Sequence, residues 1–322
     1  MKAALIGLGM VSRTYGEAFR ASDRVSLHSA FAPSLDSQER FICAFPDVCS
    51  RLAASVQDIA DDPSGDFAII TTPPNARREL VEILAAAGKP ILMEKPVERT
   101  LQAATDLVEL CDELGVPLGI VLQHRARPAV QALRQEMDEL GGLVAVEVTI
   151  PWWRPQSYYD EPGRGSYERD GGGVLISQAI HTLDLMLSLT GPVAEVTAMC
   201  ATTAFHSMEA EDFVSAGIGF ANGAGGHVFA STASFPGEGE CIALHCQHGS
   251  ARLEPGGLQI SYRDGRVEQI GAAASSGAGA DPMAFTSDWH QWSIEDFAEA
   301  ITKKRAPMIT GQDALQVHAL ID

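Results

Sequence analysis

Positive charge is scarce in this sequence. The 322 residues carry 23 Lys and Arg against 42 Asp and Glu, a formal net charge of −19, and the basic side chains form no cluster. Proteins that bind nucleic acid display a basic face, and an acidic chain is repelled by anionic membranes. We therefore expect neither a nucleic acid nor a membrane as a partner. A small anionic substrate remains compatible with this charge, because it needs only one or two local arginines.

Long hydrophobic runs and regularly spaced cysteines are also missing. No stretch approaches the roughly 20 apolar residues of a transmembrane helix, and the start, "MKAALIGLGMVSRTYG", has too short an apolar run for a signal peptide. The six scattered cysteines favour reduced thiols and a cytoplasmic location. "CIALHCQH" groups Cys241, His245, Cys246 and His248, but this spacing matches no common zinc pattern, so we expect no metal site.

Short apolar segments alternate with helical ones in the first 122 residues. "AALIG", "DFAIITT" and "PILMEK" are examples of the apolar segments. This alternation predicts an α/β domain with a doubly wound parallel sheet over residues 1–122. We expect six strands in it, with "MEKP" at the end of the fifth, and a helix opened by the "SVQD" of residues 55–58.

The pattern changes from residue 123 onward. A helix around "AVQALRQEMDEL" precedes longer strand-like segments, from "GLVAVEVTIPWW" to "LQISYRDG". They predict an α+β domain over residues 123–322 with a mostly antiparallel open sheet, whose free face favours a homodimer or homotetramer. We expect "GAAASSGAGADP" to be a mobile loop. Helices from Trp289 and Thr310 follow, and the second still runs at "ALQVHALID", so we expect the chain to continue further.

A glycine-rich turn follows the first expected strand. "ALIGLGMVS" places Gly7 and Gly9 between that strand and a helix, with Ser12 at the third glycine position of the usual pattern. Backbone N–H groups in such a turn bind the pyrophosphate of a dinucleotide at the helix N-terminus. The turn therefore predicts a dinucleotide site.

The second expected strand lacks the acidic residue that holds the adenosine ribose of NAD. That place falls near Ala32, and no carboxylate is there. Ser34 and Arg40 can instead meet a 2′-phosphate, although Ser34 can equally cap the next helix. We expect NAD or NADP as the cofactor, with NADP at least tolerated.

"MEKP" places Glu94 and Lys95 at the carboxyl end of a strand, where ligands bind in a doubly wound sheet. A lysine there can hold a substrate hydroxyl and stabilise an alkoxide. The alternative is an ion pair on the solvated surface. A chain that turns sharply back at this point also suggests a cis bond between Lys95 and Pro96.

One long apolar helix carries four polar residues. "GGGVLISQAIHTLDLMLSLTG" contains Ser177, His181, Asp184 and Ser188, spaced 4, 3 and 4 apart, so that they fall on one stripe. A helix that is apolar on the rest of its circumference is buried, and its polar stripe must face polar partners or a cavity. A core histidine satisfied by a neighbouring carboxylate is the alternative to a functional one.

Four segments together resemble the Gfo/Idh/MocA family of oxidoreductases. They are "GLGMVS", "TTPPNARREL", "AGKPILMEKPVERT" and "DGGGVLISQAIHTLDL", in the family's order and at roughly its spacing. The resemblance implies a Rossmann domain, a nicotinamide cofactor across the crevice and a sugar, polyol or sugar acid as substrate. A regulator that binds the dinucleotide without turnover, or an imine or carbonyl reductase, is the alternative.

The resemblance also implies roles for individual residues. His181 takes the hydroxyl proton, Lys95 stabilises the alkoxide, Asp184 orients the imidazole, and the three glycines before the helix let the backbone approach the reaction centre. The cofactor contacts are Gly7, Gly9, Met10, Val11, Ser34, Thr72, Pro73, Glu94 and Lys95. Two departures leave the substrate and the direction of reaction open: Ser177 stands where the family often has an acid, and Arg77 stands at a family histidine.

The loop "PWWRPQSYYDEPGRGSYERDGGG" precedes this helix and is similar to the corresponding stretch of nucleotide-sugar uronate dehydrogenases. Its arginines suit carboxylates and phosphates, and its aromatic faces suit sugar rings. Arg154 is the strongest candidate for an anionic group of the substrate, because Arg164 and Arg169 lie closer to the acids of the loop. The expected substrate contacts are Lys95, Arg154, Tyr158, Ser177 and His181. A salt-bridged surface loop is the alternative.

Overall fold

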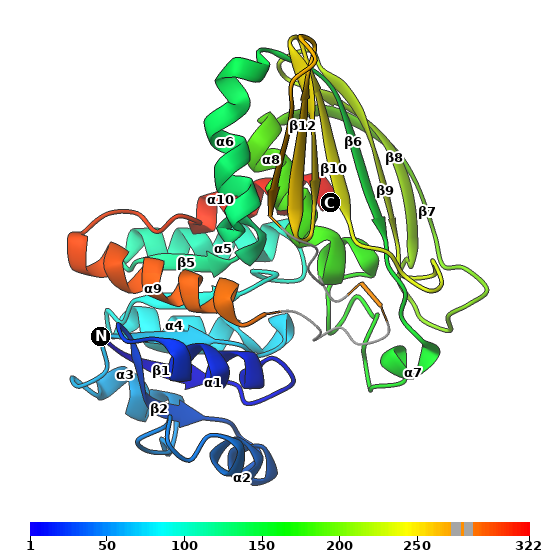
Figure 1. Ribbon diagram of the computed structural model, residues 1–322. Coiled ribbons are helices and arrows are strands. Elements are labelled where there is room, and N and C mark those ends of the chain that lie inside the picture. The colour runs from blue at the N-terminus through cyan, green and yellow to red at the C-terminus, as the bar shows by residue number, and fades with distance from the viewer. Residues whose placement is uncertain (272–277, 280–285) are drawn as a thin grey trace. The chain divides into compact units, whose positions relative to one another are not determined.

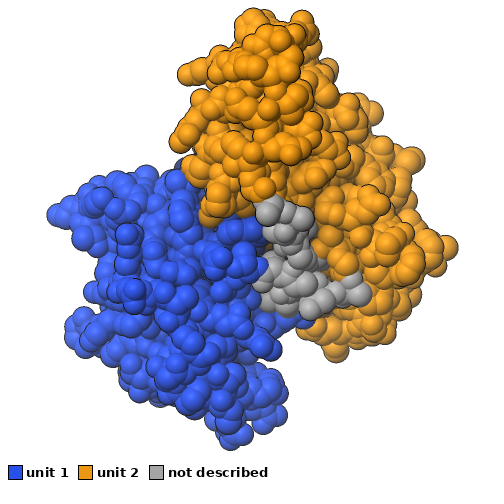
Figure 2. All heavy atoms as spheres, viewed as in Figure 1, with its two compact units in different colours: residues 1–123, 286–318, 322 blue, residues 124–285, 319–321 orange. Residues whose placement is uncertain are grey.

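The computed structural model describes residues 1–271, 278–279 and 286–322, and the chain divides into two compact units (Figure 1, Figure 2). Unit 1 comprises residues 1–123, 286–318 and 322, and unit 2 comprises residues 124–285 and 319–321. The expected division near residue 122 lies close to the observed one. The second expected domain needs a correction, because most of the closing segment returns to unit 1. Most of the segment that we expect to be a mobile loop lies outside the described residues.

Unit 1 contains a parallel sheet of five strands in the order β2-β1-β3-β4-β5. The expected count of six strands is wrong, and "MEKP" follows β4 instead of a fifth strand. Outside the named strands, Leu52 forms an isolated parallel bridge with Ala30 of β2. The elements up to residue 121 are β1 (Lys2–Ile6), α1 (Ser12–Ala21), β2 (Ser26–Phe31), α2 (Leu35–Ala44), α3 (Val56–Asp61), β3 (Phe67–Ile70), η1 (Pro74–Ala76), α4 (Arg78–Ala86), β4 (Ile91–Glu94), α5 (Leu101–Glu113) and β5 (Leu118–Val121).

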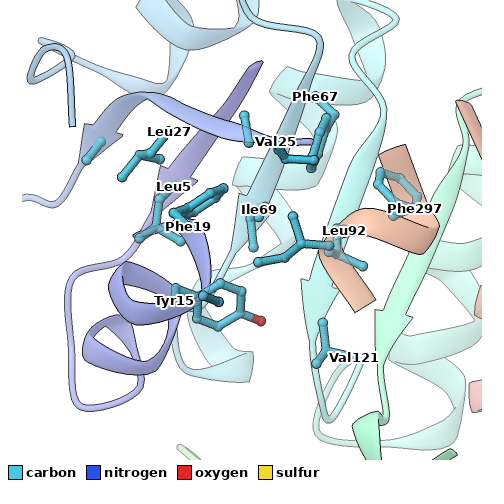
Figure 3. Close-up of a cluster of buried hydrophobic side chains, with 14 of the residues drawn as sticks. Leu5, Tyr15, Phe19, Val25, Leu27, Phe67, Ile69, Leu92, Val121 and Phe297 are labelled. Atoms are coloured by element: carbon cyan, nitrogen blue, oxygen red, sulfur yellow. The ribbon is translucent and has the colours of Figure 1, made fainter. Parts of the chain in front are cut away.

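The order of the strands makes the sheet doubly wound, as expected. The chain passes from β1 to β2 in one direction and from β3 through β4 to β5 in the other, so right-handed crossovers place α1 and the pair α4–α5 on opposite faces. The buried cluster in Figure 3 lies on the α1 face and joins Tyr15 and Phe19 to Leu5 and Ile69 of the sheet. The direction of winding reverses between β1 and β3, which is the place where such sheets bind ligands.

The helix α9 (Asp288–Lys303) completes the core of unit 1. Its Phe297 packs edge-on against Phe67, with 5.4 Å between the ring centroids. The same ring lies so close to Gly119 of β5 that a Cβ there would come within 2.6 Å of it. Beyond α9, Ile309 accepts a backbone hydrogen bond from Ile120. These contacts extend the parallel sheet's hydrophobic cover and explain why the closing segment belongs to unit 1.

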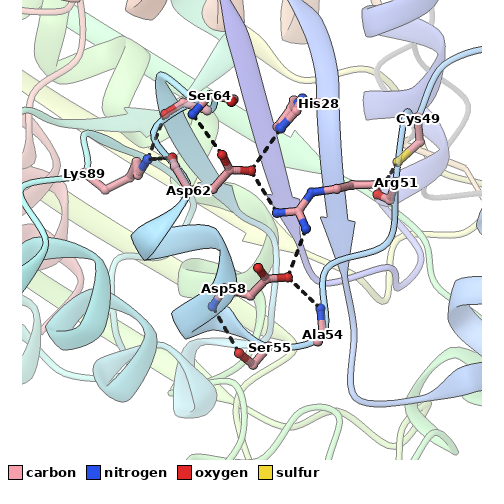
Figure 4. A network of polar contacts seen from close by, with 10 residues as sticks. His28, Cys49, Arg51, Ala54, Ser55, Asp58, Asp62, Ser64 and Lys89 are labelled. Atoms are coloured by element: carbon pink, nitrogen blue, oxygen red, sulfur yellow. Dashed lines mark hydrogen bonds and ion pairs between the residues drawn. The ribbon is translucent and has the colours of Figure 1, made fainter.

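A polar network ties the edge of the same sheet to its connections (Figure 4). The Asp62 carboxylate receives hydrogen bonds from the Ser64 backbone (2.8 Å) and the Arg51 guanidinium (2.8 Å), and it lies 3.0 Å from His28 of β2. The Ser64 N–H and then His28 lower the pKa of Asp62 to about 2. Lys89 donates to the Asp62 and Gly65 carbonyls. The network joins β2 to the segments before β3 and β4.

Unit 2 is built on a sheet of eight strands in the order β13-β12-β11-β10-β6-β9-β8-β7. Only the pair β6–β9 is parallel among these, which agrees with the expected mostly antiparallel sheet. Its elements are η2 (Gln123–Ala126), α6 (Pro128–Leu140), β6 (Leu143–Pro151), α7 (Gln156–Tyr159), η3 (Leu175–Ala179), α8 (Ile180–Thr190), β7 (Val193–Ala201), β8 (Phe213–Phe220), β9 (Gly225–Ser231), β10 (Cys241–Cys246), β11 (Gly249–Glu254), β12 (Gly257–Tyr262) and β13 (Val267–Gly271).

One side of this sheet is covered by helices, and its edge strand β7 is open. The helix α6 packs on β11, β12 and β13, and α8 packs on β6 (Figure 1). In β7, Val196 and Met199 are half exposed or more. Such an apolar edge is compatible with self-association, and the expected homodimer or homotetramer stays a prediction.

Several local expectations are confirmed. The bond between Lys95 and Pro96 is cis. The Ser55 side chain caps α3 by accepting from the Asp58 N–H, and Thr310 forms a full capping box with Asp313 at the start of α10 (Gly311–Ile321). In the described part of the chain, no helix has both the length and the apolar character needed to span a bilayer.

His318 of α10 connects the closing helix to the segment after "MEKP". Its Nε2 accepts a hydrogen bond from the Val97 backbone N–H (3.1 Å), and the ring is buried. Burial, and then the charge of Arg77, lower the pKa of His318 to about 4. The folded protein therefore holds the neutral ring, which the unfolded chain protonates below its ordinary pKa of about 6.5.

We predict that this histidine makes the stability depend on pH. Because the folded pKa is the lower one, its contribution is complete above pH of about 6.5 and falls as the pH drops towards 4, by about 3 kcal/mol in total. The variant His318→Gln keeps an acceptor but does not titrate, so its free energy of unfolding should fall less over this range. Denaturant unfolding at pH 7 and pH 4.5 measures the difference. The exposed His227→Gln is the control, and equal pH slopes in wild type and His318→Gln would contradict the prediction.

Candidate active site

The glycine-rich turn lies at the point where the winding of the sheet reverses. Gly7 has φ of +102°, and a Cβ there would come within 2.9 Å of Thr71 Oγ1, which directly follows β3. The Thr71 hydroxyl donates to the Gly7 carbonyl (2.7 Å). Only glycine fits this conformation and this contact. The turn after β1 is thereby fixed against the end of β3.

Two features of this turn fit a bound dinucleotide. A Cβ on Gly9 would meet no atom of the described chain within 4 Å, so the backbone is open to a close ligand. The buried Thr72 Oγ1 has no hydrogen-bond partner among the described residues. Ser12 donates to the Gly9 carbonyl (2.7 Å), and Met10 is 51% exposed at the tip. Val11 and Pro73, the other expected contacts, precede α1 and η1 directly.

The sequence allows two roles for Ser34 at the end of β2: contact with a 2′-phosphate and capping of the next helix. Ser34 caps α2 by accepting from the Ser37 N–H (3.4 Å). The exposed Arg40 donates to the Ser37 hydroxyl, and Ala32 is buried. The helix-capping alternative for Ser34 is therefore confirmed, while a contact of Ser34 or Arg40 with a 2′-phosphate stays a prediction.

Glu94 is a buried ion, and the alternative of a solvated surface pair is wrong for it. Its side chain accepts from the Tyr15 hydroxyl (2.9 Å) and from the Lys95 backbone N–H (3.1 Å), and it lies 3.4 Å from His290 of α9. Burial raises the pKa of Glu94, but His290 and Lys95 outweigh it and hold the pKa below its ordinary value. Burial, and then Glu94, raise the pKa of Tyr15 well above normal. A carboxylate is thus fixed directly beside Lys95.

Arg77 organises the strand ends and was not recognised from the sequence as more than a departure. Its fully buried guanidinium donates to the Thr72 carbonyl (2.7 and 2.9 Å) and to the carbonyls of Glu94, Lys95 and Pro96. Burial lowers the pKa of Arg77 to about 10. The signal in the sequence was an arginine directly after "TPPNA" and before an apolar helix, but its partners are backbone atoms that no sequence pattern shows.

The four polar residues of the expected stripe do not all lie on one regular α-helix. Ser177 lies in the π-helical turn η3, so its four-residue spacing from His181 is less than one turn there. Its hydroxyl donates to the Gly173 carbonyl. On α8, Ser188 accepts from Arg134, and the buried Asp184 forms a two-pronged ion pair with Arg125 (2.8 and 2.5 Å). His181 is 7% exposed.

Two residues of η2, His124 and Arg125, contact His181 and Asp184 and were not identified from the sequence. Arg125 pairs with Asp184, and the His124 ring stacks on the His181 ring with centroids 4.9 Å apart. The available signal was "QHRARP", three basic side chains directly after a buried strand. Arg125 binds both oxygens of the Asp184 carboxylate, and the expected orientation of His181 by Asp184 stays a prediction.

Of the three glycines before the helix, Gly173 lies close to another segment of unit 2, and the expected approach of these glycines to the reaction centre stays a prediction. A Cβ on Gly173 would lie 1.7 Å from the Glu211 carbonyl oxygen. The Glu211 carboxylate accepts from the N–H groups of Gly173 (3.0 Å) and Leu175 (3.1 Å) and so caps the helix start. The close approach recorded at Gly173 is therefore between two segments of unit 2.

The loop before this helix is largely salt-bridged. Arg164 and Arg169 both pair with Glu161, which confirms the alternative for these two. Arg154 is buried, and its Nη1 donates to the carbonyls of Trp153 (2.8 Å) and Gly279 (2.5 Å). Its guanidinium also lies 5.7 Å from the Tyr158 ring centroid. Arg154 thus holds the loop together, and its contact with a substrate anion stays a prediction.

Comparison with known families places the chain. The sequence model of the oxidoreductase family with an NAD-binding Rossmann fold matches residues 1–121, and that of the GFO/IDH/MocA C-terminal domain matches residues 130–252. The chain therefore belongs to the Gfo/Idh/MocA family, and it is an NAD-binding oxidoreductase. The alternative of a regulator without turnover is not supported.

Individual relatives cover nearly the whole chain. D-apiose dehydrogenase of Paraburkholderia graminis is 26% identical over 100% of this chain and 86% of its own. 1,5-anhydro-D-fructose reductase of Ensifer adhaerens is 27% identical over 82% of this chain and 78% of its own. The WlbA dehydrogenase of Bordetella pertussis, solved with NADH and UDP-GlcNAcA, is 26% identical. The two structures agree with a TM-score of 0.82, and the match covers 99% of this chain and 94% of that one.

We predict that Arg77 is essential for stability. The variant Arg77→Met keeps much of the volume but leaves several buried carbonyls without a donor, so the free energy of unfolding should fall by about 3 kcal/mol or more. Denaturant unfolding measures the loss. Arg78→Met is the matched control, because Arg78 is 61% exposed and forms surface ion pairs with Glu82 and Asp106, and it should change stability by about 0.5 kcal/mol or less. Equal effects of the two variants would refute the assignment.

Proposed function

We propose that the protein transfers hydride between NAD or NADP and a hydroxyl group of a sugar, polyol or sugar acid. The observation that carries the proposal is His181, a buried histidine on a mostly apolar helix, whose ring stacks on the ring of His124. An imidazole of ordinary basicity is half protonated near neutral pH, so it can accept a hydroxyl proton and return it. The relatives named for D-apiose, 1,5-anhydro-D-fructose and UDP-GlcNAcA support a carbohydrate substrate.

His181 and Lys95 carry the proposed chemistry. His181 takes the proton from the substrate hydroxyl, and the Lys95 ammonium stabilises the negative charge that develops on the oxygen. Bound NAD supplies the hydride acceptor. Glu94 fixes the Lys95 backbone, and Arg77 binds its carbonyl. Arg154, Tyr158 and Ser177 are the further proposed contacts with the substrate, and Asp184 is the proposed orienting partner of His181.

A screen of substrates tests this function. Neutral sugars, polyols and the matching uronic and aldonic acids are offered with NAD and NADP, and the absorbance of the reduced nicotinamide is followed. Because one relative is named a reductase, the corresponding ketoses and keto acids are offered with the reduced cofactors as well. Turnover of a carbohydrate in either direction supports the proposal. Imines are offered with the reduced cofactors too, and turnover confined to imines would replace the proposal with the imine-reductase alternative.

We predict a large effect from the variant His181→Ala. It removes the proposed base, so kcat should fall roughly 10²- to 10⁴-fold. The affinity for the cofactor, measured by nicotinamide fluorescence, should change little, because the ring is proposed to contact the substrate. Ser188→Ala on the same helix is the control and should retain wild-type kcat. If His181→Ala works within a few-fold of wild type, His181 is not the base.

The cofactor preference gives a second prediction. Because Ala32 stands where an NAD-specific strand end carries a carboxylate, NADP should be accepted beside NAD. The variant Ser34→Asp keeps the helix cap but adds a charge that repels a 2′-phosphate, so the ratio of kcat/KM for NAD over NADP should rise roughly tenfold or more. Ser34→Asn, which caps without charge, is the matched control and should keep the ratio. A wild-type enzyme that already rejects NADP by several orders of magnitude would contradict this.

A further inference from the structure

The short turn η2 carries two neighbouring basic side chains that reach α8. Arg125 binds both carboxylate oxygens of Asp184. The His124 ring lies beside the His181 ring at an interplanar angle of 29°, with 4.9 Å between centroids. All four residues belong to unit 2. Adjacent residues of one turn therefore contact positions 181 and 184, which lie about one helical turn apart.

His124 is held by its own partners. It is 3% exposed, and its Nδ1 lies 3.9 Å from Glu240 Oε1. The same carboxylate oxygen accepts from Arg127 Nη2 at 2.6 Å. Glu240 directly precedes β10, and Arg127 directly precedes α6. Burial of such charges is tolerated only when they are paired, so the ion pair of Arg127 and Glu240 is a fixed neighbour of the His124 ring.

A ring stacked on an imidazole contacts its face and leaves the edge, where the nitrogen atoms are, to other partners. The stack therefore constrains the plane of His181 without consuming the atoms that accept a proton. Arg125 constrains the helix one turn further on. Together the two residues of η2 restrict how the base can tilt and how its helix can slide.

We propose that His124 is a positioning residue for His181, acting through the stacked ring. The catalytic consequence rests on the function proposed above. Precise placement matters because a displacement of about 1 Å between reacting groups can cost roughly 10²-fold in rate. The role needs a flat ring at position 124 and does not need its nitrogen atoms.

Two variants separate the ring from its nitrogen atoms. His124→Phe keeps a flat ring in the stack, whereas His124→Ala removes it. We expect His124→Ala to lower kcat roughly 10- to 100-fold, while the KM for the cofactor is unchanged and His124→Phe stays within about threefold of wild type. Thermal unfolding checks that both variants are folded. His245→Ala is the matched control, since His245 lies in β10 of the same unit and is partly exposed, and it should leave the kinetics unchanged.

A measurement that needs no substrate tests the stack itself. With ¹³C-labelled histidine in the full chain, the ring signals of His181 are identified by their loss in His181→Ala. The signals should move in His124→Ala, which removes the neighbouring ring current, and should keep their position in His245→Ala.

Three results would overturn the proposal: wild-type kcat in His124→Ala, equally slow His124→Phe and His124→Ala, or His181 signals that do not move. If no substrate is turned over by wild type, the proposed function fails, while the movement of the His181 signals still decides whether His124 positions that ring.

Discussion

Arg77 joins the turns that follow two parallel strands. Its guanidinium donates to a carbonyl after β3, to that of the last residue of β4 and to the two carbonyls that follow β4, so the segments that carry Thr72 and Lys95 cannot move independently. Buried carbonyl oxygens need a hydrogen-bond donor from the protein, because water does not reach them. The Arg77 side chain is fully buried and supplies that donor. His318 satisfies the next backbone N–H in the same way. The geometry of the "MEKP" segment depends on these donors and acceptors.

The same requirement shapes the surroundings of His181 in unit 2. A helix with so much apolar surface is buried, so every polar residue on it needs a partner. Arg125 meets Asp184 and Arg134 meets Ser188. The Glu211 carboxylate caps the start of the helical segment. The polar residues of α8 thus have two arginines and the ring of His124 among their partners within unit 2.

The sequence predicted the fold well where the pattern was local and repeated. Apolar segments alternating with helices gave the doubly wound sheet, and "GLGMVS" at the first strand end gave the dinucleotide turn. The expected count of six strands was wrong, because the parallel sheet has five. The helix from Trp289 was predicted, but its unit was not, because Phe297 packs against Gly119 and Phe67, residues far away in the sequence. Contacts between distant segments leave no periodic trace in either one.

The sequence by itself determined the family, the class of reaction and the residues expected to act, because these depend on short motifs whose spacing is fixed by a strand end or a helical turn. Only the tertiary structure decided which partners those residues have. Ser34 caps a helix, Arg154 holds backbone carbonyls, and Gly173 makes room for Glu211. Each of these outcomes follows from burial, since a buried polar group bonds to whatever group the folded chain brings within reach.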